Sequence, residues 1–556
     1  MSDWAEGGPG SGRRRLARDV TLTMSLILIS RLLGFIRERA VAEVFGRTAE
    51  TDAFKAAFNI PDLMYFLLVG GAITAAFIPV FTGYLARGQE REGWRAASTF
   101  LNGTVLLLVA LTVGGMVFAP ELAPLVAFAF MGEQRDLLID LMRWMFPAVF
   151  FTALAGLGIG VLNSYRRFTL PLLGPILYNV SIILSAYLLG PHMGIRGMAV
   201  GTVVGAMLNA ALQWSQIGVR FWRWQPVLDM GHEGVRRLYR IMLPALFGLS
   251  VTQLSLIIST NLASTLPEGS ITALNLANRV MQFPLGVFAM GLSTVAYPTM
   301  AAHAALGEMG RFGSAVTGTL RGVLFLTVPS AVGLAVLAEP IIRLLFEAGQ
   351  FSAQDSRATA AALLFYSGAL ISQSASQILT RAFYSLQDTR TPVLISTGAL
   401  VVNALLNVAF LRWTSMEHAG LALAFTITSM GNWAFYLAVL HRRQAGVRLG
   451  ELGRFLALVG AASLPTGMAA WRAAAWTALR FGTESLADRG LVATAGVLAG
   501  AAVYAAITWL MGLEEARMAA GMVKRAGRRT GEGVVATLTW FWRLLRRSPG
   551  TGGVRP

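Results

Sequence analysis

Long apolar runs separated by short polar segments follow one another from residue 20 to residue 511. A helix needs about 20 mostly apolar residues to cross the hydrocarbon core of a bilayer. The pattern therefore predicts an all-α polytopic membrane protein with about 14 transmembrane helices. The predicted spans are residues 20–45, 53–85, 100–119, 138–162, 171–189, 197–219, 241–266, 271–302, 316–337, 358–386, 392–411, 420–440, 455–479 and 490–511.

Arginine residues gather in every second segment between these runs, counted from the N-terminus. Cytoplasmic segments of membrane proteins carry an excess of Lys and Arg, so we expect both termini to be cytoplasmic. The net charge of +17 then indicates contacts with membrane lipids and not with nucleic acid. The arginine-rich segments are residues 13–18, 87–95, 166–167, 220–240, 311, 390 and 442–454.

An internal repeat relates the two halves of the chain. GAITAAFIP at residues 71–79 is similar to GLSTVAYP at 291–298, and GMAVG at 197–201 is similar to GLALA at 420–424. Both second copies come about 220 residues later, as in transporters with parallel repeats. We predict two pseudo-symmetric six-helix lobes around a central cavity, followed by two extra helices.

The resulting domain boundaries follow from the spans. The two extra helices are rich in Ala and Gly, which leaves room for a groove that holds a lipid tail. The end of the chain is apolar, basic and Trp-bearing, as an interfacial helix is, although a disordered basic tail is the alternative. The predicted parts are a basic tail (1–19), an N-lobe (20–220), a C-lobe (221–440), the two extra helices (441–512) and a cytoplasmic tail (513–556).

The composition excludes several kinds of chemistry. The chain has no cysteine, which rules out disulfides and thiolate catalysis. Its five histidines are far apart and lack the spacing of metal ligands, and no phosphate-binding loop of an ATPase occurs. We therefore predict a protein that is not an enzyme and has no cofactor, with a coupling ion (Na⁺ or H⁺) and the membrane potential as candidate energy sources.

Charged residues inside the predicted spans are the candidate binding groups. A charge at the centre of a bilayer costs about 2.5 to 3.5 kcal/mol on insertion scales, so it needs a use. Arginine suits phosphate because its planar guanidinium binds two oxygens at once. The candidates are Arg31, Arg37 and Arg279 for an anionic headgroup, with Glu38, Asp52 and Lys55 as supporting charges.

Less specific interpretations of these charges stay open. The arginines of the first span could extend to the membrane surface, and Arg279 could be an interface arginine. Asp52 and Lys55 could instead mark a solvated helix start, with Asp52 near the cap.

Several segments together resemble the MurJ (MviN) family, which are lipid II flippases of the multidrug/oligosaccharidyl-lipid/polysaccharide exporter superfamily. As a set, in their order along the chain, these segments are specific for the family. They are SRLLGFIRE (30–38), TDAFKAAFNIPDL (51–63), GGAITAAFIPVF (70–81), PLLGPILYN (171–179), ANRVMQFP (277–284), LFEAGQF (345–351) and FYSLQDTRTP (383–392).

The resemblance implies a fold, a substrate and a set of residues. It implies two six-helix lobes with two extra helices, and alternating-access export of lipid II, an undecaprenyl-pyrophosphate glycolipid, for cell wall synthesis across the bacterial inner membrane. The family's cavity arginines fall on Arg31, Arg37 and Arg279. Further charged positions of some members are Tyr65 and Gly70 here, which removes charge from the cavity. Sodium is associated with some members, and Asp388 and Asn403 are the weak candidates for its site.

Other functions fit parts of the pattern. One is a flippase for another polyprenyl-linked glycan, and another is a cation-coupled multidrug exporter, which the arginines of the first span disfavour. A third is a nontransporting scaffold that contacts the cell wall synthesis machinery, for which intramembrane arginines would be an unnecessary cost.

Overall fold

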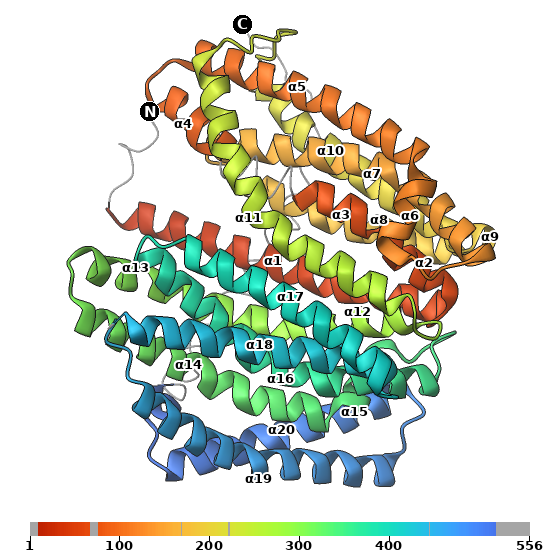
Figure 1. The fold of residues 1–556 in the computed structure, drawn as a ribbon, viewed down its shortest axis with the longest axis vertical. Helices are drawn as coiled ribbons and strands as arrows, with labels where there is room; N and C mark the ends of the chain where they lie inside the picture. Colours follow the sequence, from red (N-terminus) through yellow and green to blue (C-terminus); the bar gives the residue numbers. More distant parts are fainter. Residues whose placement is uncertain (1–8, 67–75, 168, 221–222, 444, 519–556) are drawn as a thin grey trace, which may run out of the picture.

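The computed structural model describes residues 9–66, 76–167, 169–220, 223–443 and 445–518, and the regular elements in these ranges are helices (Figure 1). The first half contains α1 (Pro9–Phe45), α2 (Ala49–Ala57), α3 (Asn59–Tyr65), α4 (Ile78–Ala86), α5 (Glu90–Val117), α6 (Ala119–Ala127), α7 (Gly132–Ser164), η2 (Leu170–Leu173), α8 (Gly174–Leu188), α9 (Gly190–Met193) and α10 (Arg196–Arg220).

The second half continues the same architecture. It contains α11 (Glu233–Ala263), α12 (Ser270–Pro284), η3 (Leu285–Ala289), α13 (Met290–Ala305), α14 (Met309–Val336), α15 (Ala338–Phe346), α16 (Ala353–Ser385), α17 (Arg390–Trp413), α18 (Glu417–Arg442), α19 (Leu449–Phe481) and α20 (Leu486–Leu510). The all-helical fold class predicted from the apolar pattern is confirmed.

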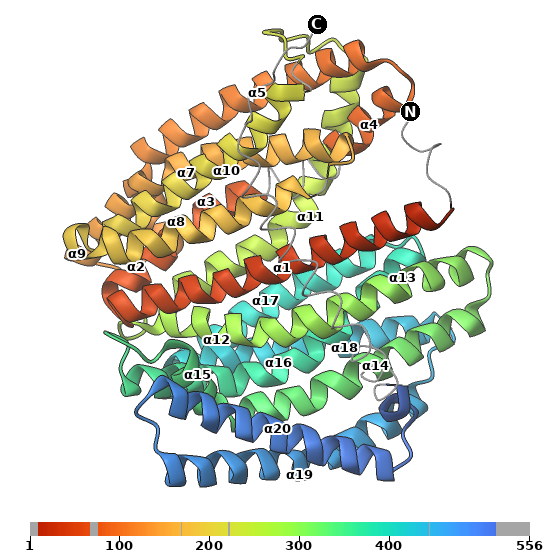
Figure 2. The same cartoon turned by 180° about the vertical axis from the view of Figure 1, so that it is seen from behind.

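The helices form two groups with α1 between them (Figures 1 and 2). In the first group α7 packs on α5 and α10, and α10 packs on α8. In the second group α16 lies at the centre and contacts α12, α14 and α18. The pair α19 and α20 packs outside α14, at the edge of the second group.

Two helices connect the groups. Helix α1 contacts α8 on one side and α15 on the other. Helix α11 runs along both groups, since it contacts α5 and α6 as well as α17. The predicted boundaries of the lobes stay predictions, and the C-terminal interfacial helix and Gly70 fall outside the described residues.

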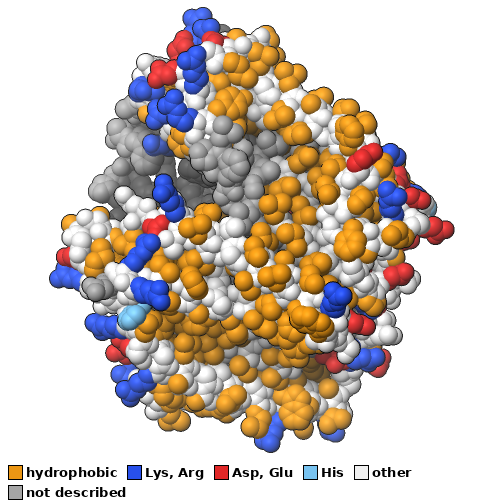
Figure 3. Space-filling view, viewed as in Figure 1, with side chains coloured by type: hydrophobic (Ala, Val, Ile, Leu, Met, Phe, Trp, Pro, Cys, Tyr) orange, Lys and Arg blue, Asp and Glu red, His pale blue; other side chains and the backbone are white. Residues whose placement is uncertain are grey.

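Apolar surface shows that the bundle suits a membrane. Within the described chain, nine helical segments are long and apolar enough to cross one, by length and composition. Figure 3 shows hydrophobic side chains over the middle of the visible face and charged side chains mostly along its margins. The chain is thus a multi-pass membrane protein, and the count of 14 spans stays a prediction.

Helix α16 explains why apolar length alone does not identify every central helix. It buries small hydroxyl side chains, among them Ser356, Ser372 and Ser374, against its neighbours. A helix surrounded by other helices does not need an apolar surface, because small polar side chains allow close packing.

One predicted span is broken in the structure, and a second is a continuous helix with a local irregularity. The span predicted at 53–85 contains α2, α3 and α4, with residues 67–75 outside the described part. The span predicted at 271–302 contains α12 and α13, joined by the single π-helical turn η3 directly after Pro284. Proline removes a backbone donor, and π-turns often occur where a helix serves a binding site.

Candidate functional site

A polar cavity of about 380 Å³ lies between α1, α2, α3, α8, α11 and α12. Its walls therefore come from both groups of helices. Three positive and two negative side chains line it, which leaves one net positive charge. The charged lining residues are Arg37, Glu38, Lys55, Asp62 and Arg279.

Glu38 is the centre of the charge network. Its side chain is only 3% exposed, and its carboxylate accepts hydrogen bonds from Arg37 Nη2 and Lys55 Nζ, both at 2.5 Å. The Nη1 atom of Arg279 lies 3.6 Å from the same carboxylate. Removing one partner of a buried ion pair costs about 3 to 5 kcal/mol, so Glu38 holds these cations in place.

Arg279 is the cation most available to a ligand. Its side chain is 42% exposed, compared with 17% for Arg37. Its 3.6 Å separation from Glu38 is longer than a hydrogen bond, so its donors are not saturated by that contact. A planar guanidinium with free donors on a cavity wall is suited to bind phosphate.

Arg31 lies apart from this cluster. It is not among the residues that line the cavity. Its Nη2 atom lies 3.7 Å from Met290 Sδ, and its guanidinium covers Gly286 in η3. The structure thus brings Arg37 and Arg279 together with Glu38 and Lys55, and places Arg31 beside the π-turn η3.

Between α1 and the α12–η3 segment, an arginine of each helix packs against a glycine of the other. A Cβ atom on Gly34 would lie 3.5 Å from Arg279 Nη2, and a Cβ atom on Gly286 would lie 2.1 Å from Arg31 Nη1. Each helix therefore supplies a glycine beneath the other helix's arginine. A larger side chain at position 286 would require the tip of the Arg31 side chain to move, so Gly286 permits the position that Arg31 has here.

Two asparagines of the cavity were missed by sequence reasoning. Asn59 Nδ2 and Asn278 Oδ1 are buried and have no hydrogen-bond partner among the described residues, and both residues line the cavity. A side-chain rotation would bring one donor and one acceptor into the cavity. Only their positions could have revealed them in the sequence, because Asn278 directly precedes Arg279 and Asn59 is the first residue of the NIPD segment.

Asp52 contacts α12 and not the arginines. Its side chain is buried and accepts hydrogen bonds from Gly269 N, Thr272 N and Thr272 Oγ1, each at 2.7 Å. The carboxylate therefore caps the N-terminus of α12, where free backbone N–H groups favour a negative charge. Asp52 is thus neither exposed to solvent nor a cap of its own helix, which Thr48 caps.

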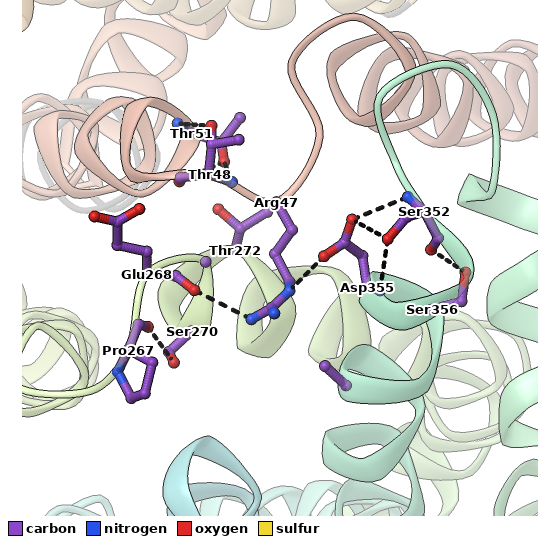
Figure 4. A network of polar contacts seen from close by, with 12 residues as sticks. Arg47, Thr48, Thr51, Pro267, Glu268, Ser270, Thr272, Ser352, Asp355 and Ser356 are labelled. Atoms are coloured by element: carbon purple, nitrogen blue, oxygen red, sulfur yellow. Dashed lines mark hydrogen bonds and ion pairs between the residues drawn. The ribbon is translucent and has the colours of Figure 1, made fainter.

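Further contacts close the same end of the bundle. Arg47 donates to the carboxylate of Asp355 at 3.0 Å and to the carbonyl of Glu268 at 3.2 Å (Figure 4). Nearby, Gln350 N donates to Glu43 O at 2.8 Å. These contacts join the α1–α2 corner to the start of α12 and to the α15–α16 corner, and we call them the corner contacts.

The two weak sodium candidates do not form one site. Asp388 precedes α17, where it accepts hydrogen bonds from Thr391 and pairs with Arg443 at 2.6 Å. Burial alone would raise the pKa of Asp388, but these bonds lower it to about 2. Asn403 lies about 20 Å further along α17 and bonds to Asn407. Within the described chain, no three acidic or histidine side chains are grouped to hold a metal.

An apolar groove of about 650 Å³ lies next to the cavity. It is lined by side chains of α1, α12, α14, α19 and α20, among them Leu32, Phe35, Phe283 and Tyr504. Helices α1 and α12 also line the cavity, so each of them separates a polar compartment from an apolar one.

Comparison with known proteins identifies the family. The sequence pattern described as lipid II flippase MurJ matches residues 41–488. The lipid II flippase MurJ of Burkholderia cenocepacia is 33% identical over 518 residues, which cover 90% of this chain and 98% of the relative. A probable lipid II flippase MurJ of Vibrio cholerae is 30% identical over 522 residues, which cover 90% and 97%.

Solved structures share the fold. A lipid II flippase MurJ in an inward closed conformation has a TM-score of 0.74 at 23% identity, covering 88% of this chain and all of that one. An inward-facing multidrug transporter of the MATE family has a TM-score of 0.63 at 13% identity, covering 78% and 98%. The resemblance found in the sequence segments is confirmed, and the chain belongs to the lipid II flippase MurJ family.

Proposed function

We propose that this protein is a lipid II flippase, which moves the undecaprenyl-pyrophosphate precursor of peptidoglycan from the inner to the outer leaflet. One observation carries the proposal, together with the family: a cationic cavity and an apolar groove share α1 and α12 as walls. A substrate with an anionic headgroup and a long apolar chain needs two such compartments next to each other.

The cavity supplies the chemistry for the headgroup. Arg279 and Arg37 bind the pyrophosphate, while Glu38, which also pairs with Lys55, keeps the arginines positioned when the cavity is empty. Asn59 and Asn278 offer their unpaired atoms to polar groups of the substrate. Arg31, beside the π-turn η3, contacts the pyrophosphate as the headgroup enters or leaves the cavity.

Transport follows by alternating access in this proposal. The corner contacts close one end of the bundle, which is the outer end if the N-terminus is cytoplasmic as the arginine pattern predicts. Breaking them and closing the opposite end releases the headgroup outside. We place the protein in the bacterial inner membrane with both termini in the cytoplasm, where it contacts lipid II, membrane lipids and the cell wall synthesis machinery.

The membrane potential can drive the cycle, with or without a coupling ion such as Na⁺ or H⁺. Moving one net negative charge out of a cell that is negative inside gains about 2.3 kcal/mol per 100 mV. We expect flipping in vesicles to slow when the potential is reversed. An unchanged rate at reversed potential contradicts the driving force.

Asp388→Asn tests the proposed coupling ion separately. We expect the flipping rate to be unchanged, since Asp388 caps a helix, and loss of ion dependence in this variant contradicts that capping role.

Complementation tests the function and the site together. Cells depleted of their own lipid II flippase would express the wild type, Arg37→Ala, Arg279→Ala and Arg31→Ala, with membrane levels measured for each. We expect rescue by the wild type and failure of Arg37→Ala, Arg279→Ala and Arg31→Ala at normal levels. Arg412→Ala is the matched control, because Arg412 is an exposed arginine in the last turn of α17.

The outcomes separate family from site. A wild type that is present in the membrane and never rescues contradicts the lipid II assignment and favours another polyprenyl-linked glycan. Full rescue by Arg37→Ala and Arg279→Ala leaves the function standing and contradicts the assignment of the anion site. Failure of Arg412→Ala would indicate that loss of any arginine is harmful.

A further inference from the structure

A second charged pocket lies at the end of the bundle where α1 ends. It has a volume of about 260 Å³ and lies between α15, the C-terminal part of α19 and the start of α20. It adjoins the apolar groove, since Leu337 lines both. None of the charged residues of the central cavity lines it.

One wall of the pocket is a charged stripe on α15. Glu339, Arg343 and Glu347 follow one another at intervals of four residues, which places them on one face of the helix and at its end. Arg343 binds Glu347 through Nε at 2.7 Å and Nη2 at 3.1 Å. Glu339 lines the pocket and makes no hydrogen bond to another side chain of the described chain.

The opposite wall holds a second arginine in a fixed position. Arg489, in the first turn of α20, pairs with Glu347 at 3.0 Å and donates to the carbonyls of Glu347 and Thr483. Glu347 is buried and shared by Arg343 and Arg489, so these three residues carry one net positive charge. Glu339 supplies one negative charge a turn away, so these four residues form a dipolar group with no net charge. Glu484, outside the lining, adds a negative charge within reach of Arg343.

The remaining lining is apolar, and Trp471 is its accessible part. Trp471 is 57% exposed, Ala475 and Ala478 further along the same helix are half-buried, and Ala474 is buried. Tryptophan is common where protein meets the membrane interface. A ligand with a charged end in the pocket would therefore lay its apolar part along α19.

We propose that this pocket binds the headgroup of a zwitterionic phospholipid, with its phosphate toward Arg343 and Arg489 and its ammonium group toward Glu339. The charge pattern matches this ligand, because both charges of the headgroup find an opposite charge. An anionic phospholipid without an amine would leave Glu339 facing its phosphate. The site is distinct from the proposed substrate site and does not depend on the proposed function.

Lipid binding to the purified full-length chain tests the proposal. Native mass spectrometry in detergent would measure binding of phosphatidylethanolamine and phosphatidylglycerol to the wild type, Glu339→Gln and Glu339→Lys. We expect the wild type to prefer phosphatidylethanolamine by about threefold, as for a partly exposed charge pair. Glu339→Gln should lose this preference and Glu339→Lys should invert it, with unfolding temperatures in lipid-free detergent unchanged.

Glu133→Lys is the matched control, since Glu133 is an exposed glutamate in the first turn of α7 and makes the same charge change outside the pocket. Its lipid preference should equal that of the wild type. Preference of the wild type for phosphatidylglycerol would overturn the proposal. So would an unchanged preference in Glu339→Lys, or the same change in Glu133→Lys.

Discussion

Glu38 illustrates how one buried acid organises several cations. Its two oxygens contact Arg37, Lys55 and, at a longer distance, Arg279. Without the acid these positive charges would repel one another inside the protein. The acid therefore serves both the stability of the folded chain and the geometry of the cavity.

Glu38→Gln should destabilise the protein by about 3 kcal/mol, because it removes the negative partner of a buried network. The measurement is denaturant unfolding in detergent. Glu50→Gln, at an exposed position of α2, is the control and should unfold like the wild type. Equal stability of Glu38→Gln and the wild type would show that the network contributes nothing net to folding.

Gly286→Ala should reduce transport on the order of tenfold, a loss equivalent to about 1.4 kcal/mol. The added Cβ atom would occupy the place of the Arg31 guanidinium and move it. Gly291→Ala makes the same change in the adjoining helix α13, with no atom within 4 Å of the added Cβ, and should be neutral. The measurement compares the flipping rates of the two variants in vesicles. Equal rates would exclude a positional role for Gly286.

The sequence predicted part of this site. A charge inside an apolar run is visible without a structure, so Arg37, Glu38 and Arg279 were found. The separation of Arg31 from them was not predictable, because it depends on the backbone at η3. Asp52 was found as a charged residue, but its partner is the backbone of a helix about 220 residues away, which leaves no mark in the sequence.

At the scale of the element, apolar length predicted where the helices lie and not where they break. The short helices α6, α9 and α15 fall in segments expected to be connections. Their lengths of 9, 4 and 9 residues are below what a span needs, so periodicity could not reveal them. Helix α15 nevertheless carries the charged stripe of the second pocket.

Ala501→Phe should slow flipping at least severalfold if the groove on α20 holds the polyprenyl chain, because the ring would fill space next to Gly500. Ala502→Phe adds the same ring at the neighbouring exposed position, which does not line the groove. The flipping rates are compared at matched membrane levels. Equal rates would place the lipid chain elsewhere.

At the scale of the whole molecule, the corner contacts hold the two groups of helices together at one end. Arg47 reaches both the loop before α12 and the cap of α16 (Figure 4). Alternating access requires these contacts to break in every cycle. The Arg47–Asp355 pair is partly buried, with 15% and 16% of its side chains exposed. Its polar groups can be hydrated once the end opens, which lowers the cost of separating them.

Linking the two sides should stop transport. The chain has no cysteine, so Arg47→Cys with Asp355→Cys can be joined without background by a short bis-methanethiosulfonate reagent, which forms a disulfide with each cysteine and releases methanesulfinate. We expect the joined protein to be inactive and to recover on reduction, while each single variant treated in the same way stays active. Continued transport by the fully joined protein would contradict the opening of this end.

The packing of arginine against glycine between α1 and the α12–η3 segment constrains how the family can change. A larger residue at position 286 moves the guanidinium only while an arginine occupies position 31. A descendant that replaces Arg31 is released from this constraint, whereas one that enlarges residue 286 first displaces a charge it still uses. Replacement of the arginine is therefore expected to precede enlargement of the glycine more often than the reverse, which reconstructed ancestral sequences can test.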